Sequence, residues 1–327
     1  MPELQHRFVQ TNGIRMHLVE AGSGPLVVLL HGFPESWYSW RHQLTALAEA
    51  GFHAVAPDQR GYGQTDQPQA IEAYSILHLV GDVVGLLAAL GERQMVVVGH
   101  DWGAPVAWNT ALFCPDLVRG VVGLSVPFRP RGQQPPLSLY RAALGENFYQ
   151  IYFQKSGVAE ADLTRDVRRS IRAALYGASG DNPTIPTMMV DPEHGFLGEV
   201  SVPERLPSWI TDQDIEFYTA EFQRSGFAGG LNWYRNIDRN WELTAPWSGA
   251  KVTPPALFVV GDRDVVYHFP GGGPSMVSNL SQSVPQLKQA VVLEGCGHWT
   301  QQERPTEVNR LLLEFLHSLP PVPAAGG

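Results

Sequence analysis

The stretch MVVVGHDWGAPVA, residues 95–107, decides the fold of this chain. It begins with an uncharged apolar run that ends at Gly99, which is typical of a parallel strand buried on both faces. The small and apolar residues after Gly103 can begin a helix, so Asp101 is expected at a strand-to-helix turn. Glycine at both positions leaves room where the chain reverses sharply and the helix packs close to the sheet. The spacing Gly-x-Asp-x-Gly matches a nucleophile elbow that carries a carboxylate where serine is usual.

A carboxylate at such a turn restricts the chemistry that the turn can support. Attack by a carboxylate on an ester or amide gives a costly anhydride, whereas displacement at a saturated carbon gives an ordinary ester. Epoxides and alkyl halides are therefore the electrophiles that suit Asp101. A helix N-cap is the structural alternative for an Asp in this position, and partner residues elsewhere in the chain must decide between the two.

Buried strand runs alternate with helical patterns on both sides of this stretch. Two strands between Arg7 and Glu20, joined at Asn12-Gly13, are expected to form an antiparallel edge. Further apolar runs predict buried strands over residues 26–30, 54–56, 118–126, 256–261 and 290–294. With amphipathic helices between them, the pattern predicts an α/β fold whose mostly parallel sheet is flanked by helices on both faces.

The alternation stops over residues 128–246, where only aromatic-rich helical patterns occur. One of these helices is expected to begin at a capping-box-like pair, Thr211 and Asp214. We therefore expect a core made of residues 1–127 and 247–327, with the segment between them inserted as a helical lid. An insertion of this kind in an α/β domain is usually functional.

Composition excludes several classes of function. The 327-residue chain has 23 basic and 32 acidic residues, a formal net charge of −9, and no run rich in lysine or arginine. Neither a nucleic acid nor a membrane is therefore expected as a partner. No apolar segment is long enough to span a membrane, the N-terminus lacks the apolar region of a signal peptide, and the two cysteines are expected to be free. These features favour a cytoplasmic protein with an uncharged substrate, and residues 320–327 are expected to form a frayed tail.

Two further groups can complete a catalytic arrangement around Asp101. His298 lies in a glycine-flanked loop after the last predicted strand, where it can activate the water that cleaves an ester. An acid must orient this histidine, and Asp262 and Asp264 both follow the preceding strand. Sequence spacing does not choose between them, and a turn beside Gly261 accounts for at least one. Because ligand sites gather at the carboxyl ends of parallel strands, we expect these loops to meet.

An oxyanion formed at the ester needs two backbone N–H donors. Trp102, the residue after the nucleophile, is expected to supply one of them. Phe33, in the loop HGFP after an earlier strand, is placed to supply the other. An ordinary turn is the alternative for that loop, because Gly and Pro occur in loops of every kind.

With these residues assembled, the chain resembles the soluble epoxide hydrolases of the α/β-hydrolase superfamily over nearly its whole length. The resemblance is carried by HGFPES (31–36), GHDWG (99–103), NFYQIYFQ (147–154), LNWYRN (231–236) and GHWTQ (297–301). It implies an α/β-hydrolase fold with a helical lid, no cofactor and no metal site. It also implies the short, bacterial-type form, without the N-terminal phosphatase domain of some vertebrate members.

The resemblance also implies roles for single residues. Asp101 would be the nucleophile, His298 the base, and Asp264 the acid of the two candidates. Tyr149 and Tyr234, one from each of two lid helices, would donate hydrogen bonds to the epoxide oxygen. A phenol suits this role because it can donate while staying neutral at pH 7. Composition alone would make both tyrosines packing residues.

The expected reaction is hydrolysis of an epoxide to a vicinal diol through a covalent ester on the nucleophile. The residues expected to contact the substrate are Phe33, Pro34, Trp102, Tyr149, Tyr234 and Trp299. A haloalkane dehalogenase, which shares the Asp elbow, is the alternative, but it would not need paired phenols. A ligand receptor on an inactive scaffold is a third hypothesis, and such a protein should have lost part of the triad.

Aromatic residues of the predicted lid favour an apolar epoxide as substrate, or else they form the core of the lid. They are Phe148, Phe153, Phe217, Phe222 and Trp233. Which epoxide is used, and whether the chain forms a homodimer, are not encoded in any of these motifs.

Overall fold

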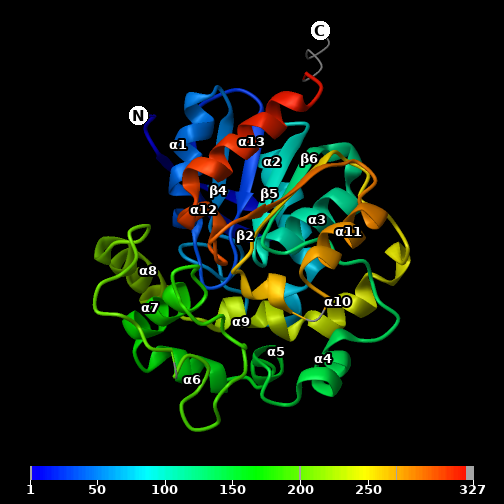
Figure 1. Cartoon of the computed structure of the whole chain (residues 1–327). Helices are drawn as coiled ribbons and strands as arrows, with labels where there is room; N and C mark the ends of the chain where they lie inside the picture. Colours follow the sequence, from blue (N-terminus) through cyan, green and yellow to red (C-terminus); the bar gives the residue numbers. More distant parts are fainter. Residues whose placement is uncertain (1, 199, 270, 322–327) are drawn as a thin grey trace.

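The computed structural model describes residues 2–321 except 199 and 270, so residues 322–327 of the expected tail lie outside the described residues. A sheet of eight strands in the order β1-β2-β4-β3-β5-β6-β7-β8 forms the centre of the molecule (Figure 1). Its strands are β1 (Gln5–Thr11), β2 (Ile14–Ala21), β3 (Leu26–Leu30), β4 (His53–Pro57), β5 (Met95–His100), β6 (Val118–Leu124), β7 (Ala256–Gly261) and β8 (Leu287–Leu293). β2 runs antiparallel to both of its neighbours, and the remaining pairs are parallel. The predicted fold class is confirmed.

Helices surround this sheet and fill the segment between β6 and β7. Those of the sheet layers are α1 (Arg41–Glu49), α2 (Ile76–Ala89), α3 (Gly103–Phe113), α11 (Pro274–Ser283), α12 (Thr300–Glu303) and α13 (Pro305–Ser318). Those between β6 and β7 are α4 (Pro136–Leu144), α5 (Tyr149–Tyr152), α6 (Val158–Thr164), α7 (Val167–Gly177), α8 (Asp212–Ser225), α9 (Ala228–Arg235) and α10 (Ile237–Leu243). Short 3-10 helices are η1 (Trp37–Trp40), η2 (Ile71–Tyr74), η3 (Pro115–Leu117), η4 (Ala245–Trp247) and η5 (Val265–His268).

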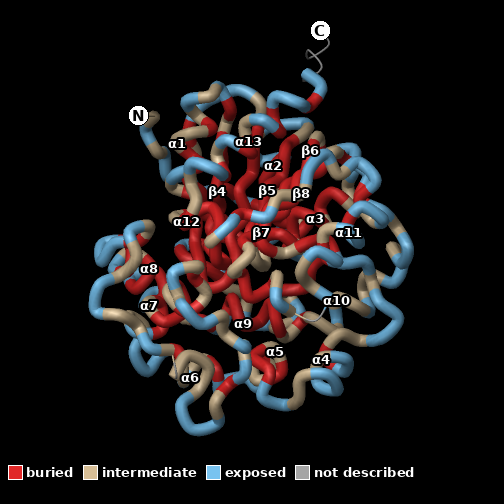
Figure 2. The backbone as a smooth tube through the Cα atoms, viewed as in Figure 1, coloured by how far each residue is buried: buried red, intermediate tan, exposed pale blue. Residues whose placement is uncertain are grey.

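Alternate residues of the parallel strands face two separate hydrophobic cores. Val97 of β5 packs in the core that contains the apolar faces of α2 and α3, whereas Val96 and Val98 pack in the core that contains those of α1 and α13. Figure 2 shows the central strands as buried tubes between these layers. Burial on both faces is the reason that these strands appear in the sequence as apolar runs without alternation.

Strands β6 and β8 each differ from the prediction at one end by two or three residues. β6 ends at Leu124 instead of residue 126, because Ser125 adopts the left-handed backbone region with φ of 68°. β8 begins at Leu287, three residues before the predicted start, and it lies at the edge of the sheet beside β7. Its first residues are partly exposed, so they did not form an apolar run that a sequence pattern could detect.

The segment between β6 and β7 contributes no strand to the sheet among its described residues. Its helices gather at one end of the sheet (Figure 1). α8 begins as predicted, because the Thr211 N–H donates to Asp214 Oδ2 at 2.8 Å and the Asp214 N–H donates to Thr211 Oγ1 at 3.2 Å. This helical segment therefore covers the edge at which the parallel strands end.

Candidate active site

Asp101 lies between β5 and α3 with φ of 49°, a left-handed conformation that residues with a Cβ seldom adopt. The two flanking glycines make this turn feasible. A Cβ on Gly99 would collide with the carbonyl group of Gly103, and a Cβ on Gly103 would collide with the carbonyl group of Leu30. The turn expected from the sequence is present, and it projects the carboxylate from the end of the central strand.

His298 lies between two carboxylates. Its Nε2 is 3.3 Å from Asp101 Oδ2, and its Nδ1 is 3.0 Å from Asp264 Oδ1. Because both ring nitrogens face acceptors, the imidazole carries a proton on each of them. Burial alone would lower the pKa of His298, but the charges and hydrogen bonds of Asp264 and Asp101 raise it well above its ordinary value. Burial would raise the pKa of Asp101, yet its hydrogen bond to His298 and the nearby positive charge lower it.

The two acids that follow β7 have different partners. Asp264 is buried, its Oδ1 faces His298, and its Oδ2 has no hydrogen-bond partner among the described residues. The same carboxylate caps η5, since Oδ1 also accepts the backbone N–H of Val266 at 2.9 Å. Asp262 instead accepts the backbone N–H of Gly295 at 2.7 Å, which ties two loops together. The structure therefore places Asp264, and not Asp262, against the histidine.

The loop after β3 contacts the other oxygen of the Asp101 carboxylate. The backbone N–H of Phe33 donates to Asp101 Oδ1 at 2.8 Å. A Cβ on Gly32 would overlap the Asp101 side chain, so glycine is needed there for the loop to come this close. Trp102 precedes α3, but no hydrogen bond joins its N–H to the Asp101 carboxylate in the described part of the chain. One of the two expected oxyanion donors thus contacts the carboxylate in this structure.

Tyr149 and Tyr234 face this site from the inserted helices. Tyr149 begins α5 and Tyr234 lies in α9, with their ring centroids 5.8 Å apart at 73°. Tyr234 also packs edge-on against Trp102, with the ring centroids 5.1 Å apart. Burial raises the pKa of both hydroxyls above the ordinary value, so both phenols stay protonated at neutral pH. The structure brings together the tyrosines that the resemblance selected.

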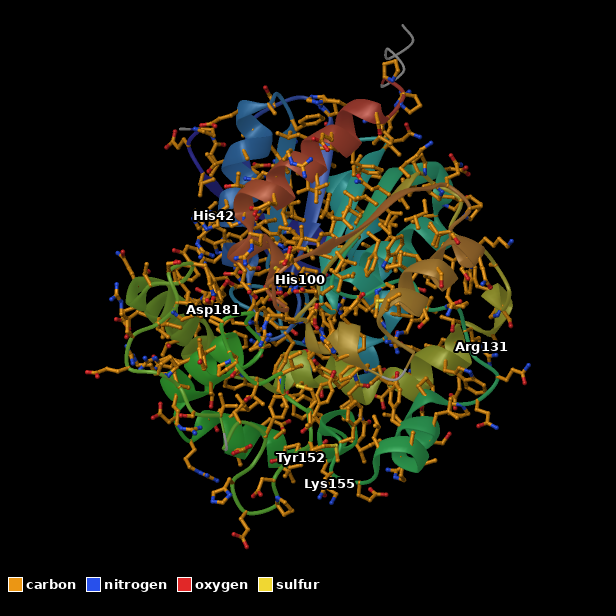
Figure 3. The ribbon with its side chains drawn as sticks, viewed as in Figure 1. His42, His100, Arg131, Tyr152, Lys155 and Asp181 are labelled. Carbon is orange, nitrogen blue, oxygen red and sulfur yellow. The ribbon has the colours of Figure 1, made fainter. Side chains whose placement is uncertain are left out.

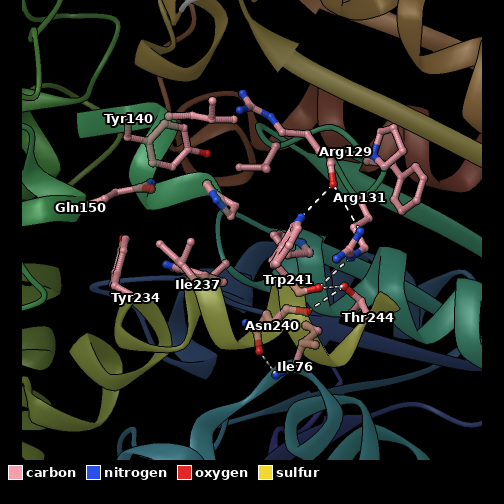
Figure 4. Close-up of a pocket in the computed structure, with 18 of the residues that line it drawn as sticks. Ile76, Arg129, Arg131, Tyr140, Gln150, Tyr234, Ile237, Asn240, Trp241 and Thr244 are labelled. Atoms are coloured by element: carbon pink, nitrogen blue, oxygen red, sulfur yellow. Dashed lines mark hydrogen bonds between the residues drawn. The ribbon is translucent and has the colours of Figure 1, made fainter. Parts of the chain in front are cut away.

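Two cavities meet at these groups, and each is lined by Asp101, Tyr149 and Tyr234. The first cavity has a volume of about 540 Å³ and is lined by residues of α4 and α10, among them Tyr140 and Ile237 (Figure 4). The second has a volume of about 580 Å³ and runs toward α7 and the chain that follows it. Trp102 lines the first cavity, whereas the second is lined by Phe33, Pro34, His298 and Trp299. Volumes of this size are usual for small-molecule sites.

The aromatic residues of the inserted segment divide between these cavities and its packing. Phe148 lines the first cavity. Phe153, Phe222 and Trp233 are buried but line neither cavity. Phe217 stacks on Tyr38, with the ring centroids 4.0 Å apart. Most of this set therefore holds the helices together, and Phe148 alone among the five contacts the space open to a substrate.

A buried ion pair that the sequence reasoning did not single out lies behind Asp101 and His298. His100 Nδ1 donates to Glu35 Oε2 at 2.7 Å, and His100 Nε2 donates to the carbonyl oxygen of His298 at 2.7 Å. Glu35 Oε2 also accepts the backbone N–H of Gly32 at 2.7 Å. Burial would raise the pKa of Glu35, but the His100 charge and hydrogen bond lower it. His100 lies near the centre of the molecule, where the sheet meets the inserted helices (Figure 3).

This ion pair joins three parts of the site: the loop that carries Phe33, the strand before Asp101 and the loop that carries His298. Its signal in the sequence is a charged residue in the apolar loop HGFPES and a histidine at the end of the run VVVG. Charged side chains in such contexts are seldom fully buried unless they are paired.

Within the described residues, no helix is long and apolar enough to cross a membrane. The same residues contain no group of three or more His, Cys, Asp or Glu side chains that could hold a metal ion.

The sheet order, the elbow at Asp101 and the histidine after the last strand define an α/β-hydrolase, and residues 25–305 match the model of the alpha/beta hydrolase fold family. The chain is 47% identical over 318 residues to epoxide hydrolase A of Mycobacterium tuberculosis, covering 96% of this chain and 97% of that protein. It is 47% identical over 324 residues to epoxide hydrolase 1 of Siraitia grosvenorii, with coverage of 97% and 99%. The crystal structure of epoxide hydrolase A from Mycobacterium thermoresistibile superposes with a TM-score of 0.91 at 48% identity, with coverage of 97% and 99%. This chain belongs to the epoxide hydrolases of the α/β-hydrolase fold family.

Proposed function

We propose that this epoxide hydrolase opens an epoxide by attack of Asp101 on a ring carbon and then hydrolyses the resulting ester with water activated by His298. The observation that carries the proposal is one constellation: a carboxylate at the elbow, a histidine 3.3 Å away, and two buried phenols lining the same cavities. We further propose that residues 1–127 and 247–327 form the hydrolase core and residues 128–246 the lid.

In the first step, a carboxylate oxygen of Asp101 forms a bond to a ring carbon while the carbon–oxygen bond of the epoxide breaks. The leaving oxygen stays attached to the substrate as an alkoxide, which needs a proton. Tyr149 and Tyr234 donate hydrogen bonds to it, and their buried hydroxyls are protonated at neutral pH. The step therefore yields a neutral hydroxyl and a neutral ester from an anion and an epoxide, so one proton is consumed.

His298 supplies the proton that ring opening consumes. Esterification removes the negative charge of Asp101, which is one of the two charges that raise the pKa of His298. The imidazolium then transfers its Nε2 proton, through solvent, to the tyrosine that protonated the alkoxide. The neutral ring can accept a proton from water, which attacks the ester carbonyl.

In the second step, the tetrahedral oxyanion is stabilised by the backbone N–H groups of Phe33 and Trp102. Its collapse breaks the bond between the carbonyl carbon and the substrate oxygen, and that oxygen takes the second proton of the attacking water as the diol leaves. The Asp101 carboxylate is restored, and the first proton of the water stays on His298. Asp264 orients the imidazole and stabilises the imidazolium.

The groups that face Asp101 distinguish this reaction from halide displacement. A departing halide needs N–H donors and no proton, whereas two phenols suit an oxygen that must be protonated. A receptor on an inactive scaffold would lack part of the triad, whereas here His298 lies 3.3 Å from Asp101 and 3.0 Å from Asp264.

Single-turnover hydrolysis in heavy-oxygen water tests the proposal. With enzyme in excess, the oxygen added to the substrate comes from Asp101, so the first diol carries no label and the protein gains it. His298→Gln is expected to open the epoxide and then accumulate an adduct heavier by one substrate, because ring opening needs no base and ester cleavage does. Asp101→Asn is the matched control, in which no adduct forms. Label in the first diol together with no adduct in His298→Gln would instead mean direct attack by water.

A further inference from the structure

The loop that carries His298 touches the inserted segment just after α7. A Cβ on Gly297 would overlap the backbone at Ser179 and Gly180, and a Cβ on Gly180 would overlap the carbonyl group of Gly295. The two stretches of chain therefore meet backbone to backbone, with a glycine on each side. In Figure 1, α7 lies among the inserted helices, whereas α12, which follows the loop, lies beside the sheet. The contact thus joins the inserted segment to the sheet layers.

Hydrogen bonds hold the two stretches together at this contact. The backbone N–H of His298 donates to the carbonyl oxygen of Ala178 at 2.8 Å. Arg263, which directly precedes Asp264, donates from Nε to the carbonyl oxygen of Gly180 at 2.9 Å. The chain after α7 is therefore bound to the loop that carries the histidine and to the loop that carries the acid facing it.

Glu303, the last residue of α12, lies at the centre of this contact and is 5% exposed. Its Oε2 accepts the backbone N–H groups of Gly180 and Gly297, each at 2.9 Å. Its Oε1 accepts the backbone N–H of Trp299 at 3.0 Å. One carboxylate therefore binds the residue before His298 and the residue after it, and it joins both to the inserted segment.

A carboxylate suits this position better than any neutral side chain of the same size. Burial raises the pKa of Glu303, whereas its three N–H donors favour the ionised form. An ionised carboxyl group has two acceptor oxygens and no donor, so all three N–H groups find an acceptor. A glutamine has one acceptor oxygen, and its NH₂ group would face at least one of the three donors. Because a buried N–H without an acceptor is unfavourable, the loop would then have to shift.

We propose that Glu303 is a positioning residue for ester hydrolysis, which fixes the backbone on both sides of His298 and so holds the imidazole where it can activate water. The proposal rests on the function proposed above and deepens it. Asp264 orients the ring through its side chain, whereas Glu303 sets the backbone from which the ring projects. Because one of its three donors is Gly180, the chain after α7 also takes part in holding the histidine.

Formation and decay of the protein adduct test this role, with styrene oxide as the probe and enzyme in excess. Glu303→Gln should slow adduct decay about ten-fold or more, since a misplacement of about 1 Å can cost about a hundred-fold in rate. Adduct formation should stay within a few-fold of the wild type, because Asp101 projects from the elbow and not from this loop. The amplitude of adduct formation counts the folded sites, so a variant that folds only in part is still compared by its rates.

Two further variants complete the comparison. Glu303→Asp keeps the charge and both acceptor oxygens on a shorter side chain, so adduct decay should be faster than in Glu303→Gln and slower than in the wild type. Glu294→Gln is the matched control, because it makes the same change in net charge at an exposed position where the same loop begins. It should leave both steps unchanged.

The proposal is overturned if Glu303→Gln leaves adduct decay unchanged, slows both steps by the same factor, or slows decay no more than Glu294→Gln does. Decay in Glu303→Asp that is as slow as in Glu303→Gln would also overturn it. If Glu303→Gln forms no adduct, Glu303→Asp decides: slower decay alone supports the proposal, and an equal effect on both steps, or none, overturns it. Failure of the wild type to form an adduct would instead overturn the proposed function.

Discussion

The site has a sheet side, where loops after the strands carry His298 and its two carboxylates, and an inserted side, where helices between β6 and β7 carry Tyr149 and Tyr234. Different interactions hold the groups on the two sides. On the sheet side, His298 lies between two carboxylates at 3.3 and 3.0 Å, and their charges and hydrogen bonds raise the pKa of the imidazole. On the inserted side, Tyr149 and Tyr234 are neutral and are packed against each other and against Phe153. The charged groups are thus paired with opposite charges, whereas the neutral phenols pack among aromatic rings.

This difference has consequences for substitution. Removing a charge on the sheet side changes the pKa of the groups that remain, because their values are set by one another. Removing a hydroxyl on the inserted side leaves the charges around His298 in place. Substitutions on the two sides should therefore slow different steps of the reaction and change its pH dependence differently.

The largest effect is expected on the inserted side. Replacing both Tyr149 and Tyr234 by Phe should slow ring opening about a thousand-fold or more, within the range of general acid catalysis, because the alkoxide loses both donors. Single-turnover measurement of adduct formation gives the rate. Tyr140→Phe is the control, since Tyr140 lines the first cavity but has no proposed role in the reaction. Ring opening at the wild-type rate in the double variant would refute the role of the phenols.

A smaller effect, in the other step, is expected on the sheet side. Asp264→Asn should slow ester hydrolysis about a hundred-fold by misorienting His298, while ring opening stays within a few-fold of the wild type. Asp262→Asn is the matched control and should be nearly neutral, because its side-chain oxygen can still accept the Gly295 N–H. An exchange of the two effects would show that Asp262 is the acid.

The same pair of variants predicts a shift with pH. Ester hydrolysis needs neutral His298, so its rate rises as pH increases through the pKa of that group. The Asp264 charge raises this pKa, and its removal should lower it. The rising limb should therefore move to lower pH in Asp264→Asn and stay in place in Asp262→Asn, as measured by the decay of the adduct across a pH series.

The sheet side could be predicted from the sequence, because its groups follow apolar strand runs. Asp101 and His298 each come after a strand, and the carboxyl ends of parallel strands must meet. The choice between Asp262 and Asp264 could not be predicted from spacing, because it depends on how η5 turns the chain after β7. No periodic pattern records a turn of this kind.

The inserted side could not be predicted from composition. Tyr149 and Tyr234 lie among many aromatic residues, and a functional phenol has the same local pattern as a packing one. Four of the five aromatic residues expected to indicate the substrate line neither cavity. The pairing of Glu35 with His100 could not be predicted from the sequence either. The pair forms only when two loops and a strand from distant parts of the chain come together.

The smallest effect is expected from removing the charge of Glu35, the partner of His100. This substitution tests whether charge pairing on the sheet side extends beyond His298 and its two carboxylates. Glu35→Gln keeps the size of the side chain and removes its charge, so we expect a loss of about 2 kcal/mol in the free energy of unfolding at pH 7. The pKa of Glu35 is lowered in the folded protein, so its contribution is fully present above the unfolded value and is lost as pH falls through the folded one. The stabilities of variant and wild type should therefore converge in acid. Urea unfolding at pH 7 and at successively lower pH measures the difference, and a gap that stays constant with pH would mean that shape, and not charge, makes Glu35 important.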